Sequence, residues 1–368
     1  MAMREPEVDA GKLRSVLIVR LGAIGDVLRA LPAVRRLRSF RPDLKIGWAV
    51  EDWVYPIVAG NPSVDHFHVL RRSRLTAGPQ SAAREIRRFV AELRGGEYDA
   101  VLDLHGRLKS GLVSKLSGAP IRIGYSRSNA SEANHLFNNV HVSLPDSSEN
   151  RVLRFLHLLS PLGIPTAWDP EDTGLYLDPI VRSGARAWHE SVGRPELAVF
   201  PGTSEGRARE RWPESKWIDL LSRLDGSGVS SAIFWGPAEA DLAARVAASA
   251  GSRAVLAPAT TLPEMLAMIG CCDGFIGSDT AAMHMAWLQG VPTAVFVGPK
   301  SPRTVAPLDP VISRVLRAEE FYVEGAKARR QPEEIVTAVP VGEAMEAVRY
   351  VLDASRALSL RRGGLSLS

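Results

Sequence analysis

The sequence predicts an α/β protein made of two doubly wound domains with parallel sheets, and three observations support this fold class. Short β-rich runs alternate with amphipathic helical patterns almost from the start of the chain, as in βα units. The alternation is interrupted by a Pro- and Asp-rich passage from Pro165 to Pro179, and then resumes. With 368 residues, the chain also reaches the length at which one hydrophobic core usually becomes two.

The first series of predicted elements fills the N-terminal half of the chain. Its strands are short and apolar, and its helices show the 3.6-residue period of a half-buried surface. In chain order the elements are a strand from Ser15 to Arg20, a helix from Asp26 to Arg38, strands from Lys45 to Val50 and Asp65 to Leu70, a helix near Ser81 to Arg94, a strand from Ala100 to Leu104 and a helix near Leu108 to Ser117.

The second series begins after a helix-like stretch, Asn150 to Leu162, and the Pro- and Asp-rich passage, where we place the domain boundary. Its elements are strands at Leu197 to Phe200, Ser231 to Trp235, Gly274 to Gly277 and Thr293 to Val297, and helices at Glu214 to Leu224, Ala238 to Ala250, Pro263 to Gly270 and Thr280 to Gln289.

We therefore predict an N-terminal Rossmann-like domain over residues 1–175 and a second over 176–340. Residues 341–357 form a helix able to pack back across the domains, and residues 358–368 a frayed tail. Because open α/β sheets bind ligands outside the carboxyl ends of their strands, we expect the active site in a cleft between the domains.

The composition indicates in which cellular compartment the protein works. The two cysteines, Cys271 and Cys272, are adjacent, which argues against a structural disulfide between them and against a thiol zinc cluster, and favours a reducing cytosol. The segment from Met1 to Gly11 is too charged for a secretory signal, and no run of about 18 apolar residues suggests a membrane span. We expect a cytoplasmic protein, soluble or peripheral on a membrane.

Basic residues gather in the N-terminal half. They are Arg71, Arg72, Arg74, Arg84, Arg87, Arg88 and Arg94. The asymmetry predicts an anionic partner, and anionic lipid or a phosphorylated sugar fits at least as well as nucleic acid, because no zinc-finger spacing, aromatic RNA-binding signature or long basic tract is present. The alternative for any one of these arginines is that it only solvates a helix face.

Asp26 is the candidate catalytic residue of the first domain. It ends the loop Arg20-Leu21-Gly22-Ala23-Ile24-Gly25-Asp26, which follows the first strand and opens a helix. The loop lacks the spacing of dinucleotide and Walker loops, and a carboxylate there would repel phosphate. Two interpretations remain: Asp26 complements the helix dipole, or it acts as a general base that takes a proton from an acceptor hydroxyl.

A second polar segment, Gly277-Ser278-Asp279-Thr280-Ala281-Ala282-Met283-His284, also leads from a strand into a helix. Asp279 and Thr280 are residue types that cap helices, and Thr280 and His284 share one face. The first-turn amides and the imidazole suit a diphosphate. The alternative is a capped helix with a histidine satisfied by its neighbours.

Two further loops of the second domain carry polar groups at strand ends. Phe200-Pro201-Gly202-Thr203-Ser204 leads through Arg207, Arg209 and Arg211 to Trp212-Pro213, and these hydroxyls and guanidiniums suit phosphate oxygens. Trp235-Gly236-Pro237-Ala238-Glu239 offers a carboxylate to ribose hydroxyls. We find no D-x-D, no histidine ligand spacing, no G-x-S-x-G elbow and no Cys/His pair, so we expect neither a cofactor nor metal-dependent chemistry.

In this order the motifs resemble glycosyltransferase family 9, whose members carry an R-L-x-x-[IL]-G-D-V loop, a P-G-[TA]-S segment and a D-T-G-x-x-H helix start. The likeness runs from about Val16 to about Pro302. It includes Tyr98-Asp99-Ala100-Val101-Leu102-Asp103 with Gly106 and Lys109-Ser110, a stretch typical of heptosyltransferase I.

The resemblance implies a GT-B fold that transfers heptose, with inversion, from ADP-L-glycero-D-manno-heptose to the Kdo-containing inner core of lipopolysaccharide at the inner membrane. It implies that Asp26 is the base. It also assigns ADP binding to Thr203, Ser204, Arg209, Arg211, Glu239, Asp279, Thr280, Ala281 and His284, and acceptor binding to Gly25, Arg71, Arg72, Arg74 and Lys109.

Two positions depart from the family pattern. Ala281 stands where a glycine is expected, and its methyl group crowds a close approach of phosphate to the backbone. The lysine expected before the aromatic-proline pair is absent, so we look to Arg209 or Arg211 for the cation, with Glu210 opposing it. The alternatives are a relative with another nucleotide-sugar or acceptor, a catalytically silent nucleotide-sugar-binding protein, and a GT-B-like epimerase. The missing glycine fingerprint disfavours an NAD-dependent oxidoreductase.

Overall fold

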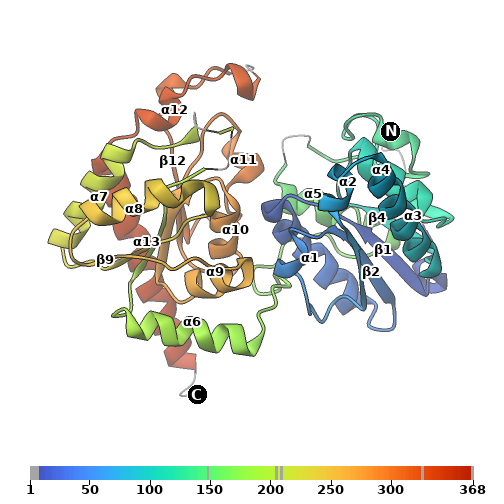
Figure 1. Ribbon diagram of the computed structural model, residues 1–368, viewed down its shortest axis with the longest axis horizontal. Helices are drawn as coiled ribbons and strands as arrows, with labels where there is room; N and C mark the ends of the chain where they lie inside the picture. The colour runs from blue at the N-terminus through green and yellow to red at the C-terminus, as the bar shows by residue number, and fades with distance from the viewer. Residues whose placement is uncertain (1–7, 147–148, 204–205, 208–209, 325–326, 366–368) are drawn as a thin grey trace. The chain divides into compact units, whose positions relative to one another are not determined.

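The computed structural model describes residues 8–146, 149–203, 206–207, 210–324 and 327–365. The chain forms two compact units, Met1–Tyr176 and Leu177–Ser368, and each contains its own six-stranded sheet (Figure 1). All the paired strands are parallel. The predicted α/β class, with two parallel-sheet domains, is therefore confirmed.

The first sheet has the strand order β3-β2-β1-β4-β5-β6. Its strands are β1 (Ser15–Val19), β2 (Lys45–Glu51), β3 (His66–Leu70), β4 (Ala100–Asp103), β5 (Ile121–Tyr125) and β6 (Val140–Val142), and its helices are α1 (Ile24–Phe40), α2 (Arg72–Thr76), α3 (Pro79–Gly95), α4 (Leu108–Leu116) and α5 (Arg151–His157).

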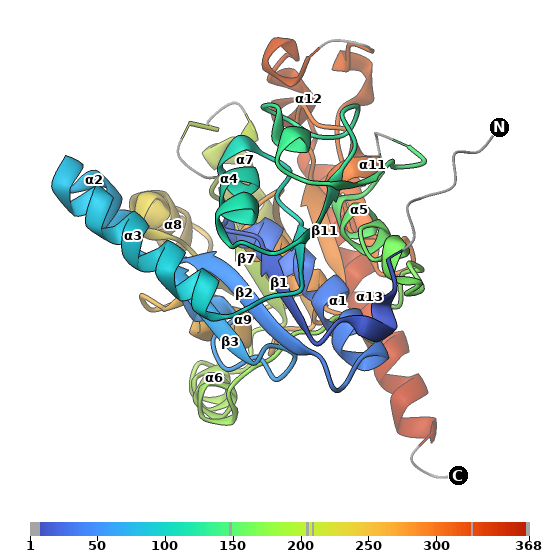
Figure 2. The ribbon, with the colours of Figure 1, turned by 90° about the vertical axis from the view of Figure 1, so that its right-hand side faces the viewer.

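Strand side chains divide this sheet into two buried faces, because successive residues point to opposite sides. Leu17 and Val19 of β1 pack with Phe89 and Leu93 of α3 in one core, and α3 follows that face of the sheet (Figure 2). Helices α1 and α5 pack against each other. Burial on both faces explains why these strands are continuous apolar runs.

The second sheet has the order β12-β11-β10-β7-β8-β9. Its strands are β7 (Leu197–Phe200), β8 (Ser231–Ile233), β9 (Ala254–Leu256), β10 (Gly274–Ser278), β11 (Thr293–Phe296) and β12 (Ser313–Leu316), and its helices are α6 (Pro179–Ser191), α7 (Glu214–Gly226), α8 (Ala240–Ser249), α9 (Leu262–Ile269), α10 (Ala281–Trp287), α11 (Pro302–Val305), α12 (Glu334–Thr337) and α13 (Val341–Leu365).

Aromatic packing anchors this second unit. Trp212 stacks on Phe296 with ring centroids 4.7 Å apart, and Trp217 meets both rings edge-on. Helix α13 packs on α7 and on β10, β11 and β12. It continues to Leu365, so the prediction of a tail from residue 358 is wrong for the residues up to 365.

Other differences from the sequence prediction are local. Strands β5, β6, β9 and β12 and helices α2, α6, α11 and α12 were not predicted. The helix-like stretch from Asn150 to Leu162 is broken: Asn150 caps α5, and a separate 3₁₀ turn begins at Ser160, followed by Pro161. Proline cannot donate the backbone hydrogen bond that a longer helix needs.

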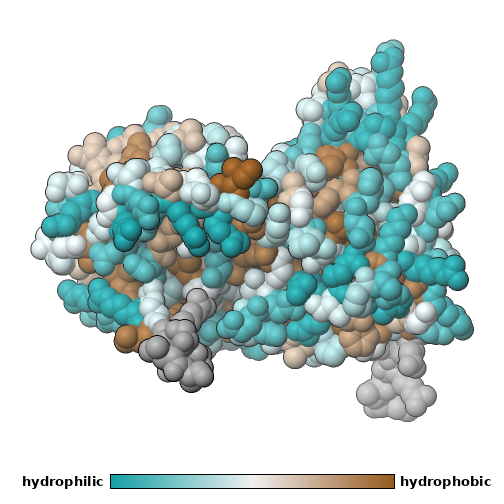
Figure 3. Space-filling model, turned by 90° about the horizontal axis from the view of Figure 1, so that it is seen from below, coloured by the Kyte–Doolittle hydropathy of each residue, from teal (hydrophilic) through white to brown (hydrophobic). Residues whose placement is uncertain are grey.

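None of the described helices is apolar over a length that would carry it through a bilayer. On the face drawn in Figure 3, hydrophobic side chains lie between hydrophilic ones.

His68 makes the stability of the first unit depend on pH. Its Nε2 lies 2.7 Å from the Tyr98 hydroxyl, and burial lowers the pKa of His68 to about 4. The unfolded chain binds this proton near pH 6.5, so stability that is full above that pH is lost as pH falls towards 4, by roughly 3 kcal/mol.

We expect urea unfolding to show this loss between about pH 7 and about pH 4.5, and His68→Gln to reduce it because the amide does not titrate. His141→Gln, at an exposed position, is the control. An unchanged pH dependence in His68→Gln would contradict the assignment.

Candidate functional site

Each sheet reverses its strand order at one place, and predicted site residues lie there. In the first sheet the reversal falls between β1 and β4, and in the second between β7 and β10. Loops leave the carboxyl ends of such neighbouring strands in opposite directions and open a crevice that binds ligands. Asp26 follows β1, Thr203 follows β7 and Asp279 follows β10. The topology therefore supplies one candidate crevice in each unit.

Asp26 is held by three arginines. Its carboxylate contacts the guanidinium of Arg20, at the end of β1, and lies 2.5 Å from Nη2 of Arg29, one helical turn further along α1. Arg151, the first residue of α5, places Nη1 at 2.9 Å and 3.1 Å from the two carboxylate oxygens. We name Asp26, Arg20, Arg29 and Arg151 the arginine cage.

The arginine cage fixes the charge of Asp26. Burial by itself would raise the pKa of this carboxyl, but the guanidiniums of Arg20, Arg29 and Arg151 together hold the pKa well below its usual range. Arg20 and Arg29 are buried, whereas the Arg151 side chain is 38% exposed. Asp26 thus does more than complement a helix dipole, and Arg151 is the cage member that a ligand can reach.

The loop after β4 is organised by a buried carboxylate that sequence analysis did not single out for a role. Asp103 accepts hydrogen bonds from the backbone N–H groups of His105 and Gly106, from the Ser110 hydroxyl and from the Asn134 amide at 2.6 Å. Burial raises the pKa of Asp103, and these hydrogen bonds oppose the rise. The network fixes this loop beside the loop that carries Asp26.

His105 lies in that loop. Burial and the neighbouring Arg20 lower its pKa to about 3, so the imidazole is neutral at pH 7. Its buried Nδ1 has no hydrogen-bond partner among the described residues. A neutral imidazole here adds hydrogen-bonding capacity beside the arginine cage without adding charge.

The predicted acceptor residues are joined by the loop after β2. Lys109 forms an ion pair with Glu51, which also accepts a hydrogen bond from Nε1 of Trp53 at 2.6 Å. The Arg72 guanidinium lies 6.0 Å from the centre of the Trp53 indole. A Cβ atom on Gly22 would lie 3.1 Å from the same indole, so the loops after β1 and β2 touch.

The remaining predicted acceptor residues have weaker links. Arg71 and Arg74 are exposed at the start of α2, and no ion pair joins them to the arginine cage among the described residues. The carbonyl of Gly25 accepts from Nε of Arg29 at 3.2 Å. A shallow hollow between α2 and the loop after β2 is lined by Asp52, Trp53, Arg72, Ser73 and Thr76.

In the second unit the loops after β7 and β8 meet. Arg211 donates from Nε to the Thr203 hydroxyl at 3.4 Å and from Nη2 to the Thr203 carbonyl at 3.3 Å. Glu239 packs behind Gly202, where a Cβ atom would lie 2.2 Å from the Glu239 side chain. Burial raises the pKa of Glu239, and Arg211 opposes the rise. Ser204 and Arg209 lie outside the described residues.

The loop after β10 carries a series of linked polar side chains. Nε1 of Trp287 donates to Nδ1 of His284 at 3.0 Å, so the proton of the neutral imidazole is on Nε2, 3.7 Å from Asp279. Lys300, which sequence analysis missed, lies 2.6 Å from the other Asp279 oxygen. Thr280 occupies the N-cap of α10 without a capping side-chain bond, and its hydroxyl is buried without a partner among the described residues. Ala281 follows, partly buried.

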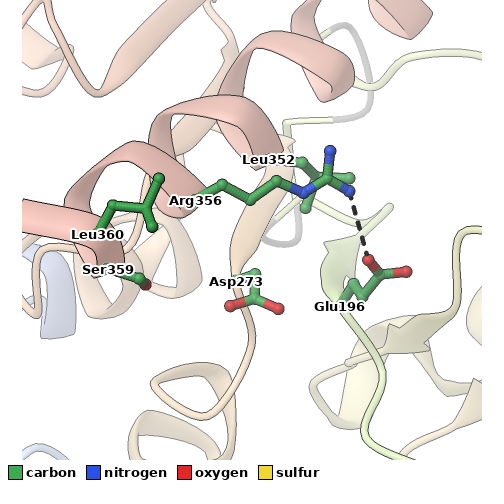
Figure 4. A pocket seen from close by; sticks show the side chains of 6 residues that line it. All are labelled: Glu196, Asp273, Leu352, Arg356, Ser359 and Leu360. Carbon is green, nitrogen blue, oxygen red and sulfur yellow. Dashed lines mark ion pairs between the residues drawn. The ribbon is translucent and has the colours of Figure 1, made fainter. Parts of the chain in front are cut away.

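A hollow in the second unit lies at the amino ends of its strands. It is lined by Glu196, Asp273, Leu352, Arg356, Ser359 and Leu360 (Figure 4). Glu196 precedes β7 and Asp273 precedes β10, so both stand at the amino ends of their strands. An Arg356–Glu196 ion pair at 3.8 Å crosses the hollow. It is therefore separate from the crevice that holds Thr203 and Asp279.

Among the described residues, no three His, Cys, Asp or Glu side chains gather in a way that would hold a metal ion. The expectation that no cofactor takes part stays a prediction.

Residues 86–331 match the family model of glycosyltransferase family 9 (heptosyltransferase). Lipopolysaccharide heptosyltransferase 1 of Pseudomonas aeruginosa is 28% identical to this chain, over 78% of the chain and 79% of that protein. The enzyme of the same name from Escherichia coli K12 is also 28% identical, over 78% and 88%, and lipopolysaccharide heptosyltransferase 2 of that strain is 25% identical, over 83% and 89%.

Solved structures share the fold. A family 9 glycosyl transferase from Veillonella parvula superimposes with a TM-score of 0.77 at 19% identity and covers 95% of this chain and 98% of its own. The E. coli heptosyltransferase WaaC with ADP gives a TM-score of 0.74 at 22% identity, with 91% and 99% covered. Both likenesses extend over the two units.

Glu239 provides a test of the crevice in the second unit. Gly202→Ala places a methyl group against the buried Glu239 side chain and displaces it. We expect nucleotide affinity, measured by calorimetry, to fall about tenfold, as for the loss of one hydrogen bond to a charged group.

Gly226→Ala is the control, since a Cβ atom there meets nothing within 4 Å. Equal nucleotide affinity in the two variants would remove Glu239 from the binding site.

Proposed function

The chain belongs to glycosyltransferase family 9, and on that premise we propose that this glycosyltransferase moves heptose from ADP-L-glycero-D-manno-heptose to the Kdo-containing inner core of lipopolysaccharide. The observation that carries the proposal is the arginine cage, an ionised carboxylate at the reversal of the first sheet. Relatives named lipopolysaccharide heptosyltransferase 1, 2 and 3 favour this substrate class, although they do not choose between the subtypes.

Asp26 is the proposed general base of an inverting displacement. The acceptor hydroxyl gives its proton to the carboxylate while its oxygen attacks the anomeric carbon. The bond from that carbon to the diphosphate oxygen breaks, and its electron pair stays on the departing ADP. A base of this kind must be ionised when the acceptor arrives, and the arginine cage ensures that state.

The arginine cage also weakens Asp26 as a base, because three guanidiniums stabilise its charge. Binding of the acceptor reduces this stabilisation, because the anionic groups of the acceptor compete for the exposed guanidinium of Arg151. When Arg151 turns to the acceptor, the pKa of Asp26 rises and the carboxylate becomes a better proton acceptor. Arg151 is thus a proposed acceptor-binding and positioning residue, with Arg71, Arg72, Arg74, Lys109 and Gly25 as the predicted remainder of that surface.

The second unit is the proposed donor site. Glu239, in the loop after β8, accepts from ribose hydroxyls, and Thr280 and His284 donate to the diphosphate. Thr203, whose hydroxyl donates to the Arg207 carbonyl at 3.0 Å, shapes the loop at its predicted place in the donor site. The tautomer of His284 supports this role, because its Nε2 carries the proton. Ser204, Arg209, Arg211 and Ala281 keep their predicted places in the donor site. We propose that the protein works at the cytoplasmic face of the inner membrane, in peripheral contact with it.

Acceptor-dependent release of ADP is the decisive measurement. We expect wild-type protein to release ADP from ADP-heptose when Kdo-bearing lipid A is present, and much more slowly without it. Binding of ADP-heptose without turnover would indicate another acceptor or a silent binding protein. Turnover of a nucleotide-sugar without any acceptor would indicate an epimerase.

Asp26 variants test the base. Asp26→Asn should abolish transfer and spare ADP binding. Because it leaves the guanidiniums of Arg20, Arg29 and Arg151 unbalanced, we also expect a stability loss of about 3–5 kcal/mol, so circular dichroism must accompany the assay. Asp26→Glu keeps the charge, shifts the carboxylate and should lower kcat about 100-fold. Wild-type turnover by a folded Asp26→Asn protein would refute the assignment.

Arg151→Met tests the competition for Asp26. Activity falls as pH drops through the pKa of a base, and removal of one guanidinium raises that pKa. We therefore expect the acid limb of the kcat/KM profile, which reports the free enzyme, to move to higher pH, and the KM for the anionic acceptor to rise while that for ADP-heptose stays constant.

Arg154→Met is the matched control, because Arg154 lies one turn further along α5 and stacks on Tyr125 instead. If Arg151→Met left both the profile and the acceptor KM unchanged, Arg151 would have only a structural role.

A further inference from the structure

We propose that Lys300 supplies the cation that binds the diphosphate of the donor and receives its charge as it departs. The inference rests on the proposed transfer from a nucleoside diphosphate sugar and goes beyond the donor residues identified from the sequence. It arises from the pairing of Lys300 with Asp279, which brings an ammonium group from the loop after β11 to the end of β10.

The two arginines of the loop after β7 that the structure describes, Arg207 and Arg211, are engaged by groups of that loop. Arg211 uses Nε and Nη2 to bind Thr203 and is thereby part of the loop itself. Arg207 lies 3.6 Å from Glu210, which partly neutralises it. Arg209 lies outside the described residues. The sequence predicted that the carboxylate of Glu210 would oppose phosphate binding; its ion pair with Arg207 reduces that effect.

Two contacts place the Lys300 loop in the same crevice as Thr203. The Ser278 hydroxyl, at the end of β10, donates to the Glu210 carbonyl at 3.5 Å. A Cβ atom on Gly298 would lie 3.3 Å from the side chain of Glu210. The loops after β7 and β11 therefore meet over the end of β10, beside the reversal of the second sheet, and Lys300 follows Gly298 by two residues.

The geometry leaves Lys300 able to serve a ligand. Its ammonium group has three N–H donors, of which Asp279 takes one at 2.6 Å, and its side chain is 26% exposed. Asp279 therefore aims the ammonium group without using all of its donors. Since ammonium is a compact point charge, it suits a phosphate oxygen whose charge increases during bond cleavage.

Arg317 supports the same loop through a hydrogen bond to its backbone. Its buried guanidinium donates from Nη1 to the Lys300 carbonyl at 3.3 Å and stacks 4.0 Å from the centre of the Tyr322 ring. Its Nη2 has no hydrogen-bond partner among the described residues. Arg317 also forms an ion pair with Glu319 at 3.5 Å, so its role toward Lys300 is to hold the backbone of the loop.

The step that Lys300 assists is the cleavage described above. The bond between the anomeric carbon and the β-phosphate oxygen breaks, its electron pair stays on that oxygen, and the oxygen accepts a hydrogen bond from the ammonium group. No proton is transferred from Lys300. The interaction strengthens as negative charge grows, so it lowers the barrier more than it stabilises the bound donor.

The test compares ADP, AMP and adenosine binding by calorimetry in wild-type protein, Lys300→Met and Lys300→Arg. We expect Lys300→Met to weaken ADP about 10- to 100-fold, AMP less, and adenosine not at all, because only the phosphates meet the ammonium group. Lys300→Arg should restore much of the ADP affinity. In the transfer assay, Lys300→Met should lower kcat more than it raises the donor KM.

Lys327→Met, at an exposed lysine of the same unit, removes the same charge and is the control. Wild-type ADP affinity in Lys300→Met, or an equal loss for adenosine and ADP, would overturn the inference and leave Lys300 with a structural role. If wild-type protein bound UDP in place of ADP, the donor proposal would fail, and UDP, UMP and uridine would test Lys300 in the same way. Failure to bind any nucleotide would reject both.

Discussion

The first unit depends on one electrostatic balance, the carboxylate of Asp26 against the guanidiniums of Arg20, Arg29 and Arg151. Charges removed from water are tolerated only when they are paired with good geometry. Arg20 belongs to the end of β1, Arg29 to α1 and Arg151 to α5, so a single carboxylate ties a strand to two helices. The loop after β1 is held where the sheet reverses its order, and the chemistry proposed for this protein begins from that position.

In the second unit the charged groups are distributed over several loops. Asp279 stands between the imidazole of His284 and the ammonium group of Lys300, while Glu239 is packed behind Gly202. Trp287 fixes the tautomer of His284 from within α10, and Arg317 fixes the loop of Lys300 from the end of β12. Each polar group that can face a ligand is thus oriented by a second group that belongs to the buried part of the unit.

The sequence predicted the fold well because its signal is local. Alternation of apolar strands and amphipathic helices identified most elements to within a few residues, and the position of Asp26, Thr203 and Asp279 after strands followed from that order. Strands β5 and β12 were missed because each contains an arginine that interrupts its apolar run. The partners of these site residues were harder to predict. Arg151 reaches Asp26 across 125 positions of sequence, and Lys300 reaches Asp279 from another strand end, so only tertiary structure reveals either pair.

The reversal of strand order in each sheet has a consequence for how specificity can change. The residues that hold the strands together are apolar and lie within β1, β4, β7 and β10, whereas the residues that face a ligand lie in the loops that follow them. Loops tolerate substitution and insertion better than the strands that they connect. The two crevices are built from separate stretches of chain, so mutations can alter the choice of one substrate without disturbing either the sheet beneath it or the recognition of the other. Such an architecture lets a lineage diversify the sugars that it joins while it keeps a single scaffold.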